Sequence, residues 1–204
     1  MSSSIQAIIF DFGGVLIEWD PRNLYRRYFS DQPQAIEKFL SDVNFSEWNA
    51  QQDKGRPFSE GVASLSAQFP QYSNFIHAFH EHWEESVGKP ITGTVEILRQ
   101  LKQESWPVYG LSNWSEETFP IVRSKYNFFD LLDDILISGQ VKMIKPYPEI
   151  FQIFLKKIGR TAEECVFIDD SLPNIKTAQA LGFIAIQFQS AEQLRIELHQ
   201  FNLL

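Results

Sequence analysis

The strongest constraint on the fold of this chain is a short stretch near its amino terminus, Ile8-Ile9-Phe10-Asp11-Phe12-Gly13-Gly14-Val15-Leu16. The apolar, isoleucine-rich first part is typical of a strand buried on both faces, as in a parallel sheet covered by helices. Asp11 ends this strand, and two glycines follow, where the backbone can turn sharply. A carboxylate in this place faces the crevice in which open α/β sheets bind ligands, although an aspartate that merely starts a turn gives the same pattern.

Beyond residue 90 the sequence alternates between helical periodicity and short apolar runs. Apolar runs predict further strands at residues 108–111, 135–137, 166–168 and 183–187. Periodicity predicts helices around residues 95–101 and at 116–126, 147–158, 173–181 and 191–200. This alternation predicts an α/β fold, a doubly wound parallel sheet with helices on both faces.

Residues 21–86 break that alternation, because they show only helical periodicity. This is far more chain than a crossover helix needs, so we expect an inserted helical domain that folds over the carboxyl edge of the sheet. Residues 15–20 before it are expected to form a short extended flap. The predicted organisation is therefore an α/β core of residues 1–20 and 87–204 and a helical cap of residues 21–86.

Polar residues lie at strand ends or in the loops beyond them at four points: Asp11, Ser112-Asn113, Lys145-Pro146 and Asp169-Asp170. Right-handed crossovers bring the carboxyl ends of all parallel strands to one edge of the sheet. We therefore expect these residues to form one site, although they are far apart in the sequence.

In this order and spacing, the chain resembles the haloacid dehalogenase superfamily over essentially its whole length. Four segments carry the resemblance: Phe10-Asp11-Phe12-Gly13-Gly14-Val15-Leu16, Leu111-Ser112-Asn113, Lys145-Pro146, and Val166-Phe167-Ile168-Asp169-Asp170-Ser171-Leu172-Pro173-Asn174. Each string is common by itself, and the combination is specific. The resemblance implies a Rossmann-like core and identifies residues 21–86 with the cap that this superfamily inserts after its first strand and flap.

The resemblance also implies roles for the residues at the predicted site. Asp11 would be the nucleophile that accepts a phosphoryl group, and Mg²⁺ would be held by Asp11, the Gly13 carbonyl and Asp170. Lys145 would neutralise charge on Asp11 and the phosphoryl oxygens. Ser112 and the Asn113 amide would donate hydrogen bonds to those oxygens.

Gly13 departs from the pattern of the family's phosphatases, which usually carry a second aspartate there as the acid/base. Asp-x-Gly variants resemble the α-glucose-1-phosphate phosphatase group, whose leaving group is a hemiacetal and needs less protonation. General acid/base assistance contributes typically ~10²–10⁴ in rate, so activity can persist with such substrates. Water, the substrate, or Glu18 or Asp20 of the flap are the candidates to replace the missing group.

Several nearby residues have weaker assignments. Asp169 and Asn174 are expected to assist only through hydrogen bonds, and Trp114 is a candidate for the border of the substrate pocket. The stretch Asp53-Lys54-Gly55-Arg56 is interpreted as a polar turn of the cap, from which Lys54 or Arg56 would reach substrate. Lys142 is interpreted as a solvated charge.

The function predicted from these features is a magnesium-dependent phosphatase that hydrolyses a small phosphorylated metabolite, with sugar phosphates as candidates, through an aspartyl-phosphate. The alternative enzyme is a 2-haloacid dehalogenase, against which Asp170 argues. A catalytically weak protein that binds a phosphorylated ligand or a partner stays open because of Gly13.

Charge and composition limit the partners. The chain carries 26 acidic and 18 basic residues, a net charge of -8, and no basic run, which disfavours nucleic acid and anionic membranes. No secretory signal is evident, and a cytoplasmic location is expected. The single cysteine, Cys165, precedes an apolar run and is expected to be a buried structural thiol. A monomer and a homodimer are equally compatible with the sequence.

Overall fold

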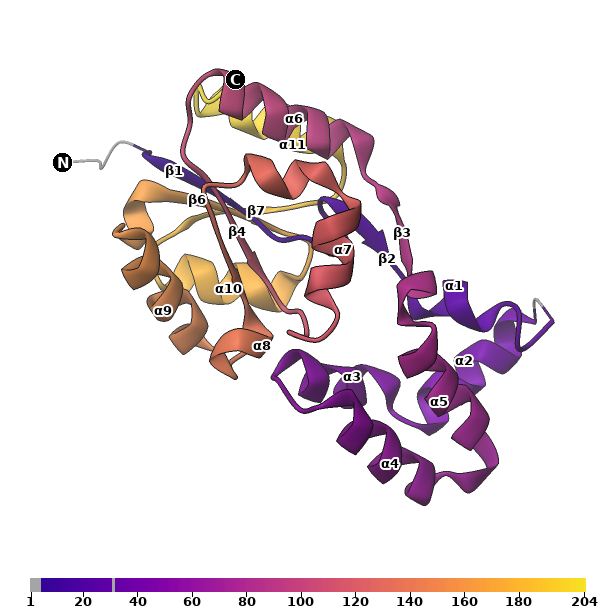
Figure 1. The fold of residues 1–204 in the computed structure, drawn as a ribbon. Coiled ribbons are helices and arrows are strands. Elements are labelled where there is room, and N and C mark those ends of the chain that lie inside the picture. Colours follow the sequence, from indigo (N-terminus) through magenta and orange to yellow (C-terminus); the bar gives the residue numbers. More distant parts are fainter. Residues whose placement is uncertain (1–4, 31) are drawn as a thin grey trace.

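The computed structural model describes residues 5–30 and 32–204. Its central element is a parallel sheet with the strand order β5-β4-β1-β6-β7 (Figure 1). The strands are β1 (Ala7–Phe10), β4 (Val108–Ser112), β5 (Asp134–Ile137), β6 (Cys165–Asp169) and β7 (Ile184–Gln187). The first strand, β1, lies in the middle of the sheet. The chain then adds β4 and β5 on one side of β1 and β6 and β7 on the other. Ligands bind beyond the carboxyl ends of the strands at such a reversal.

Helices cover both faces of this sheet. Ile8 and Phe10 of β1 pack into one apolar cluster with α6, α7 and α11, and Ala7 and Ile9 pack into a second cluster with α9 and α10. This alternation follows from the two-residue period of a strand. The predicted doubly wound α/β fold is therefore confirmed. The elements outside the sheet are α6 (Thr92–Gln103), α7 (Phe119–Lys125), η3 (Asn127–Leu131), α8 (Ser138–Val141), α9 (Pro148–Ile158), η4 (Ala162–Glu164), α10 (Leu172–Ala180) and α11 (Ala191–Gln200).

Two features of this half differ from the sequence prediction. The helix expected over residues 116–126 begins only at Phe119, after a turn in which the Ser115 hydroxyl accepts a hydrogen bond from the Glu117 N–H. The short helix α8 was not predicted, since four residues are too few to show helical periodicity.

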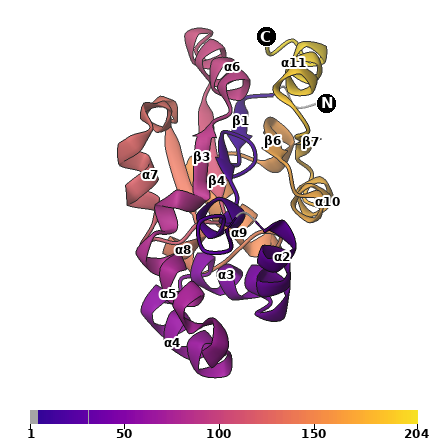
Figure 2. The same cartoon turned by 90° about the vertical axis from the view of Figure 1, so that its right-hand side faces the viewer.

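The segment predicted as helical contains only helices and 3₁₀ turns in its described residues (Figure 2). They are α1 (Pro21–Tyr25), α2 (Pro33–Asp42), α3 (Phe45–Asp53), α4 (Phe58–Gln68), η1 (Pro70–Tyr72), α5 (Ser73–Glu81) and η2 (Trp83–Ser86). We call residues 21–86 the cap. Its division from a core of residues 1–20 and 87–204 stays a prediction, and residues 1–4 of that core lie outside the described part.

An aromatic cluster holds the cap helices together. Tyr25 is fully buried, with ring centroids 4.8 Å from Phe39, 6.3 Å from Phe45 and 6.4 Å from Phe79. Its hydroxyl donates a hydrogen bond to the Phe75 carbonyl (3.2 Å). Large rings with a satisfied polar end contribute apolar burial without leaving an unpaired hydroxyl. These rings are continuous with the apolar cluster that covers one face of the sheet.

A small antiparallel sheet lies where the chain enters and leaves the cap. It pairs β2 (Ile17–Trp19), the expected flap, with β3 (Val87–Pro90), which was not predicted as a strand. The Ile91 N–H donates to the Leu16 carbonyl (2.9 Å) and the Asp20 N–H to the Ser86 carbonyl (2.9 Å). Because the two connections are bonded to each other, the base of the cap is fixed beside the end of β1. None of the described helices has both the length and the apolar character that crossing a membrane requires.

The close approach of Phe12 to Gly110 provides a test of the packing under the site. A Cβ atom at Gly110 would lie 2.3 Å from Cζ of Phe12, whose ring is packed against Phe119 and Phe129. We expect Gly110→Ala to lower the free energy of unfolding by about 1–3 kcal/mol through overpacking. Urea denaturation measures this change. Tyr109→Phe on the same strand is the control, with a change expected within about 0.5 kcal/mol. A neutral Gly110→Ala would contradict the packing described here.

Candidate active site

The polar residues predicted to converge do so at the carboxyl edge of the sheet. Asp11 directly follows β1, Ser112 ends β4, and Asp169 ends β6. Asp11, Ser112, Asn113 and Asp170 all line one cavity of about 220 Å³. The parallel topology thus brings together residues that are up to 159 positions apart, from Asp11 to Asp170.

The ammonium group of Lys145 lies at the centre of this arrangement. Its Nζ is fully buried, 3.0 Å from Asp11 Oδ1 and 2.6 Å from Asp169 Oδ2, and it donates a third hydrogen bond to the Leu111 carbonyl (2.9 Å). All three ammonium protons are therefore used. Burial lowers the pKa of Lys145, but the two carboxylates outweigh it and hold the pKa above its ordinary value. Lys145 consequently remains charged.

Asp169 supports Lys145 from behind. It is fully buried and accepts hydrogen bonds from Asn174 Nδ2 (2.9 and 3.0 Å) and from the Ser171 N–H (2.8 Å), in addition to Lys145. Asp169 and Asn174 thus make the hydrogen bonds expected of them, and their assistance to a reaction stays a prediction. These contacts fix the Asp169 carboxylate, which in turn fixes the Lys145 ammonium in place.

Asp11 is only 7% exposed, and its Oδ1 accepts a hydrogen bond from the Phe12 N–H (2.7 Å). The Ser112 hydroxyl is a further hydrogen-bonding partner of its carboxylate. The pKa of Asp11 is raised to about 7, chiefly by burial and also by the charge of Asp169, while the charge of Lys145 acts in the opposite direction. The carboxylate would therefore gain from additional positive charge at the cavity.

The donor set beside Asp11 fits a hard divalent cation. Oxygen atoms of Asp11, Asp169 and Asp170 lie within 4.8 Å of one another. Asp169 is occupied by its own donors, which leaves Asp11 and the exposed Asp170 for an ion, with Gly13 lining the same cavity. Burial and the charge of Asp169 raise the pKa of Asp170, so this carboxylate too lacks sufficient positive charge. Carboxylate oxygens are the ligands that Mg²⁺ prefers.

Gly14 is required for the close approach of the loop after β1 to the loop after β6, which carries Asp170. Its φ is +76°, and a Cβ atom there would lie 2.4 Å from Asp170 Oδ2. Only glycine combines that backbone conformation with that proximity. The second glycine of the first motif thus has a direct structural role in placing Asp170 next to Asp11.

The side chain of Asn113 contacts the protein. Its Nδ2 donates to the Lys145 carbonyl (2.9 Å), and its Oδ1 accepts from the Lys145 N–H (2.8 Å). This pair of hydrogen bonds fixes the backbone that carries the ammonium group. Phosphate binding by Asn113 stays a prediction, and its side-chain amide has a positioning contact that the sequence did not reveal.

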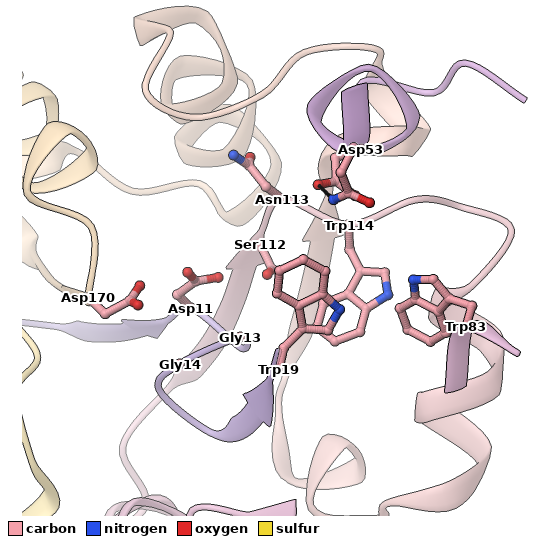
Figure 3. A pocket seen from close by; sticks show the side chains of 11 residues that line it. Asp11, Gly13, Gly14, Trp19, Asp53, Trp83, Ser112, Asn113, Trp114 and Asp170 are labelled. Atoms are coloured by element: carbon pink, nitrogen blue, oxygen red, sulfur yellow. Dashed lines mark hydrogen bonds between the residues drawn. The ribbon is translucent and has the colours of Figure 1, made fainter. Parts of the chain in front are cut away.

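Three indole rings form the opposite wall of the cavity (Figure 3). Trp19 comes from β2, Trp83 from the end of the cap, and Trp114 from the loop after β4. The rings of Trp83 and Trp114 are 5.7 Å apart and inclined by 67°. Trp114 lines this cavity, and its place at the border of a substrate pocket stays a prediction. Trp19 and Trp83 line the cavity as well, although neither belongs to a motif with informative spacing.

Asp53 at the end of α3 is a cavity residue that the sequence analysis missed. Its Oδ2 accepts from Asn49 Nδ2 (2.9 Å), and its carboxylate also accepts from the Ser115 N–H. The pKa of Asp53 is raised to about 7, chiefly by burial and also by the negative charge of Asp11, while the hydrogen bond from the Ser115 N–H acts in the opposite direction. The polar stretch that includes Asp53 was interpreted as a turn, and no sequence signal distinguished Asp53 from its neighbours.

The charged neighbours of Asp53 point elsewhere. Lys54 Nζ lies 5.8 Å from the ring centre of Tyr147, and Arg56 donates to Gln52 Oε1 (2.6 Å) and the Trp48 carbonyl (3.1 Å). Neither is among the described residues that line the cavity. Lys142 is exposed, as expected for a solvated charge, and it also donates to Glu116 (2.7 Å) and to the Gly55 carbonyl (3.4 Å).

The two flap acids named as possible proton donors have other partners. Glu18 accepts from the Lys89 N–H (3.2 Å), and Asp20 caps α1 through the Arg22 N–H (2.9 Å). Within the described chain, the cavity wall includes neither of them. The flap instead contributes the indole of Trp19.

A family model of haloacid dehalogenase-like hydrolases matches residues 5–182. The chain belongs to this family and is a hydrolase of the HAD-like class. The match includes all the site residues described above, from Asp11 to Asp170.

Similar proteins include several phosphatases. The chain is 28% identical over 203 residues to sesquiterpene phosphatase astK of Aspergillus oryzae, which covers 98% of each chain. It is 24% identical over 208 residues to D-ribitol-5-phosphate phosphatase of Bacteroides thetaiotaomicron, which covers 95% of this chain and 97% of the other. A wild-type HAD family enzyme from Bacteroides thetaiotaomicron, solved with magnesium and inorganic phosphate, is 27% identical, with a TM-score of 0.69 and coverage of 92% and 96%.

The adjacent aspartates at the end of β6 provide a matched test of the buried ion pairs. Asp169→Asn places an NH₂ group against the ammonium and amide donors that Asp169 now accepts from. We expect this change to cost about 3 kcal/mol of unfolding free energy, since it breaks a buried pair. Asp170→Asn, at an exposed residue, is expected to change it by no more than about 0.5 kcal/mol. Equal effects in urea denaturation would contradict the separate roles.

Proposed function

We propose that this chain is a magnesium-dependent phosphatase that hydrolyses a small phosphorylated metabolite through an aspartyl-phosphate on Asp11. The observation that carries the proposal is the position of Asp11, which faces the cavity with the Lys145 ammonium at 3.0 Å and Asp170 beside it. The phosphatases among its relatives support the same reaction class.

The residues divide the work of phosphoryl transfer. An Asp11 oxygen attacks phosphorus, the bond from phosphorus to the leaving oxygen breaks, and water then releases phosphate from Asp11. Lys145 offsets negative charge on the carboxylate and the phosphoryl oxygens, and the Ser112 hydroxyl donates a hydrogen bond at the same place. Mg²⁺, held by Asp11, Asp170 and the Gly13 carbonyl, would reduce repulsion between the carboxylate and the phosphate.

The dehalogenase alternative is disfavoured by the same geometry. Attack by a carboxylate on carbon needs no cation, yet Asp170 places a further acidic group beside Asp11, and Gly14 is required to accommodate it. A binding protein without activity would not need a buried nucleophile next to a charged lysine. These observations favour the phosphatase.

Substitution of Asp11 and of Asp170 tests this proposal. We expect phosphate release from α-glucose 1-phosphate and p-nitrophenyl phosphate to need magnesium and to fall by at least about 10⁴-fold in Asp11→Asn, because the nucleophile is lost. Asp170→Asn is expected to raise the magnesium concentration for half-maximal rate by about 10–100-fold, since one ligand loses its charge.

Phosphate and halide release are measured together over a panel of sugar phosphates, nucleotides and 2-haloacids. Lys142→Gln, at a lysine outside the cavity, is the control and should retain the activity of the wild type. Halide release without metal would favour the dehalogenase, and activity that survives in Asp11→Asn would contradict the phosphatase mechanism.

The walls of the cavity indicate the chemical class of the leaving alcohol. Trp19, Trp83 and Trp114 present apolar ring faces, while Asn49 and Asp53 present polar atoms at one side. A cyclic alcohol with an apolar face and a hydroxyl edge, as in a sugar phosphate, matches both kinds of wall. The three indoles also fit a terpenoid alcohol, and a sesquiterpene phosphatase is among the relatives. We propose the sugar phosphate first, because it uses the polar atoms as well.

Removal of one indole tests this assignment. We expect Trp19→Ala to lower kcat/KM about 10-fold for α-glucose 1-phosphate, because contact with the ring is lost. Acetyl phosphate has no ring, so kcat/KM for this substrate should change less than about twofold in Trp19→Ala. The control is Trp106→Ala, since Trp106 is also partly buried but lies outside the cavity. Equal losses for both substrates would contradict a role in leaving-group recognition, and preference for farnesyl phosphate over all sugar phosphates would favour the terpenoid.

A further inference from the structure

Gly13 leaves the proposed reaction without a proton donor on the first strand loop. A leaving alkoxide must gain a proton as its bond to phosphorus breaks, and the attacking water must lose one afterwards. A group that performs both tasks must face the cavity, and it must be neither the nucleophile nor a metal ligand. Neither Glu18 nor Asp20 of the flap meets the first condition.

Asp53 meets both conditions. Three carboxylates are found among the described residues that line the cavity: Asp11, Asp53 and Asp170. Asp11 is the proposed nucleophile and Asp170 a proposed metal ligand, so Asp53 is the one left for another role. Figure 3 shows Asp53 near Trp114, on the far side of Ser112 from Asp170. A leaving group bound between the indoles and Asp11 would lie next to it.

Contacts between cap and core fix this carboxylate. Its own helix provides the Asn49 amide at 2.9 Å, and the core provides the Ser115 N–H. The Ser138 hydroxyl donates to the Asp53 carbonyl at 2.5 Å, and its oxygen accepts from the Trp114 N–H at 2.9 Å. The end of α3 is thus bonded to the same core loop that follows Ser112.

The charges around Asp53 favour a carboxyl that exchanges protons near neutrality. From β1, Asp11 acts on it with a negative charge across the cavity. Lys54 beside it contacts Tyr147, and Lys142 of the core is paired with Glu116, while Asp170 adds negative charge to the same cavity. With burial and Asp11 opposing its ionisation, the pKa of Asp53 is about 7, and both protonation states are populated at neutral pH.

We propose that Asp53, from the cap, is the general acid and base of this enzyme in place of the residue absent at Gly13. In the first step, the Asp53 carboxyl gives its proton to the leaving oxygen as the P–O bond breaks, which yields the alcohol and an Asp53 carboxylate. In the second step, this carboxylate takes a proton from the water that attacks the aspartyl-phosphate. Phosphate and the Asp11 carboxylate are released, and Asp53 is again protonated. This inference rests on the proposed phosphatase function.

Two substrates of similar size and different leaving-group basicity test this role. Asp53→Asn should lower kcat/KM for benzyl phosphate by about 100-fold or more, because its poor leaving group needs the proton. The p-nitrophenolate of p-nitrophenyl phosphate leaves without protonation, so kcat/KM for this substrate should change by less than about threefold. The amide keeps the shape of Asp53, and Asp130→Asn is the matched control, because Asp130 is exposed and does not line the cavity. It should match the wild type with both substrates.

The pH dependence provides a second readout. In the wild type, the rate of benzyl alcohol release should fall as the pH rises through about 7, because Asp53 loses the proton that it donates. Asp53→Asn should lack this alkaline limb. Loss of activity toward both substrates in Asp11→Asn tests the phosphatase itself, so failure of the two proposals can be distinguished.

A rescue experiment uses the space at Gly13. A Cβ atom there would meet only Trp19 Cβ, at 3.9 Å, and the φ of Gly13 is not positive, so Gly13→Asp is accommodated. In the Asp53→Asn background it should restore benzyl phosphate turnover to within about 10-fold of the wild type. Equal losses for both substrates in Asp53→Asn, an effect on KM alone, or a double variant no better than Asp53→Asn would overturn the proposal.

Discussion

A single buried ammonium group, that of Lys145, links two carboxylates that end neighbouring strands, Asp11 after β1 and Asp169 in β6. Two acids this close would otherwise repel each other in a medium that screens charge poorly. The third ammonium proton goes to the Leu111 carbonyl on β4. Lys145 therefore contacts residues of three adjacent strand ends, and the position of the nucleophile depends on this contact.

The remaining contacts around Lys145 restrict where it can lie. Asn113 holds its backbone through two hydrogen bonds, and Asn174 and Ser171 hold Asp169 on the other side. Breaking a buried ion pair leaves an uncompensated charge, which is costly in free energy. Lys145 and the two carboxylates therefore hold one another in position. The open side of Asp11 faces the cavity, and this is where positive charge from a cation is useful. The site is asymmetric for this reason: it is closed on the lysine side and open on the side of Asp170.

The sequence was sufficient to predict the sheet, the helical segment and the convergence of Asp11, Ser112, Asn113 and Asp170, because each depends on local pattern and on the rule that parallel strands end together. It could not predict that Asn113 would bond to the Lys145 backbone, since an amide at a strand end can bond to a neighbouring backbone as well as to a ligand. Trp19, Trp83 and Asp53 were missed for a related reason. Their positions depend on how the cap meets the core, and a single sequence carries no periodic signal for that contact. The strand β3 is visible only through its partner β2.

The location of Asp53 on the cap has a consequence for how such an enzyme would work. An acid/base next to the nucleophile on the same loop is present whether or not the cap is in place. An acid/base on α3 is present only while Ser138 and Ser115 of the core hold the end of that helix. Proton transfer would then be coupled to the fit between cap and core, the same fit that forms the indole wall. Gly13 also leaves room next to Trp19 that a longer side chain would occupy. The loss of one acid and the gain of space for substrate are thus two effects of the same residue.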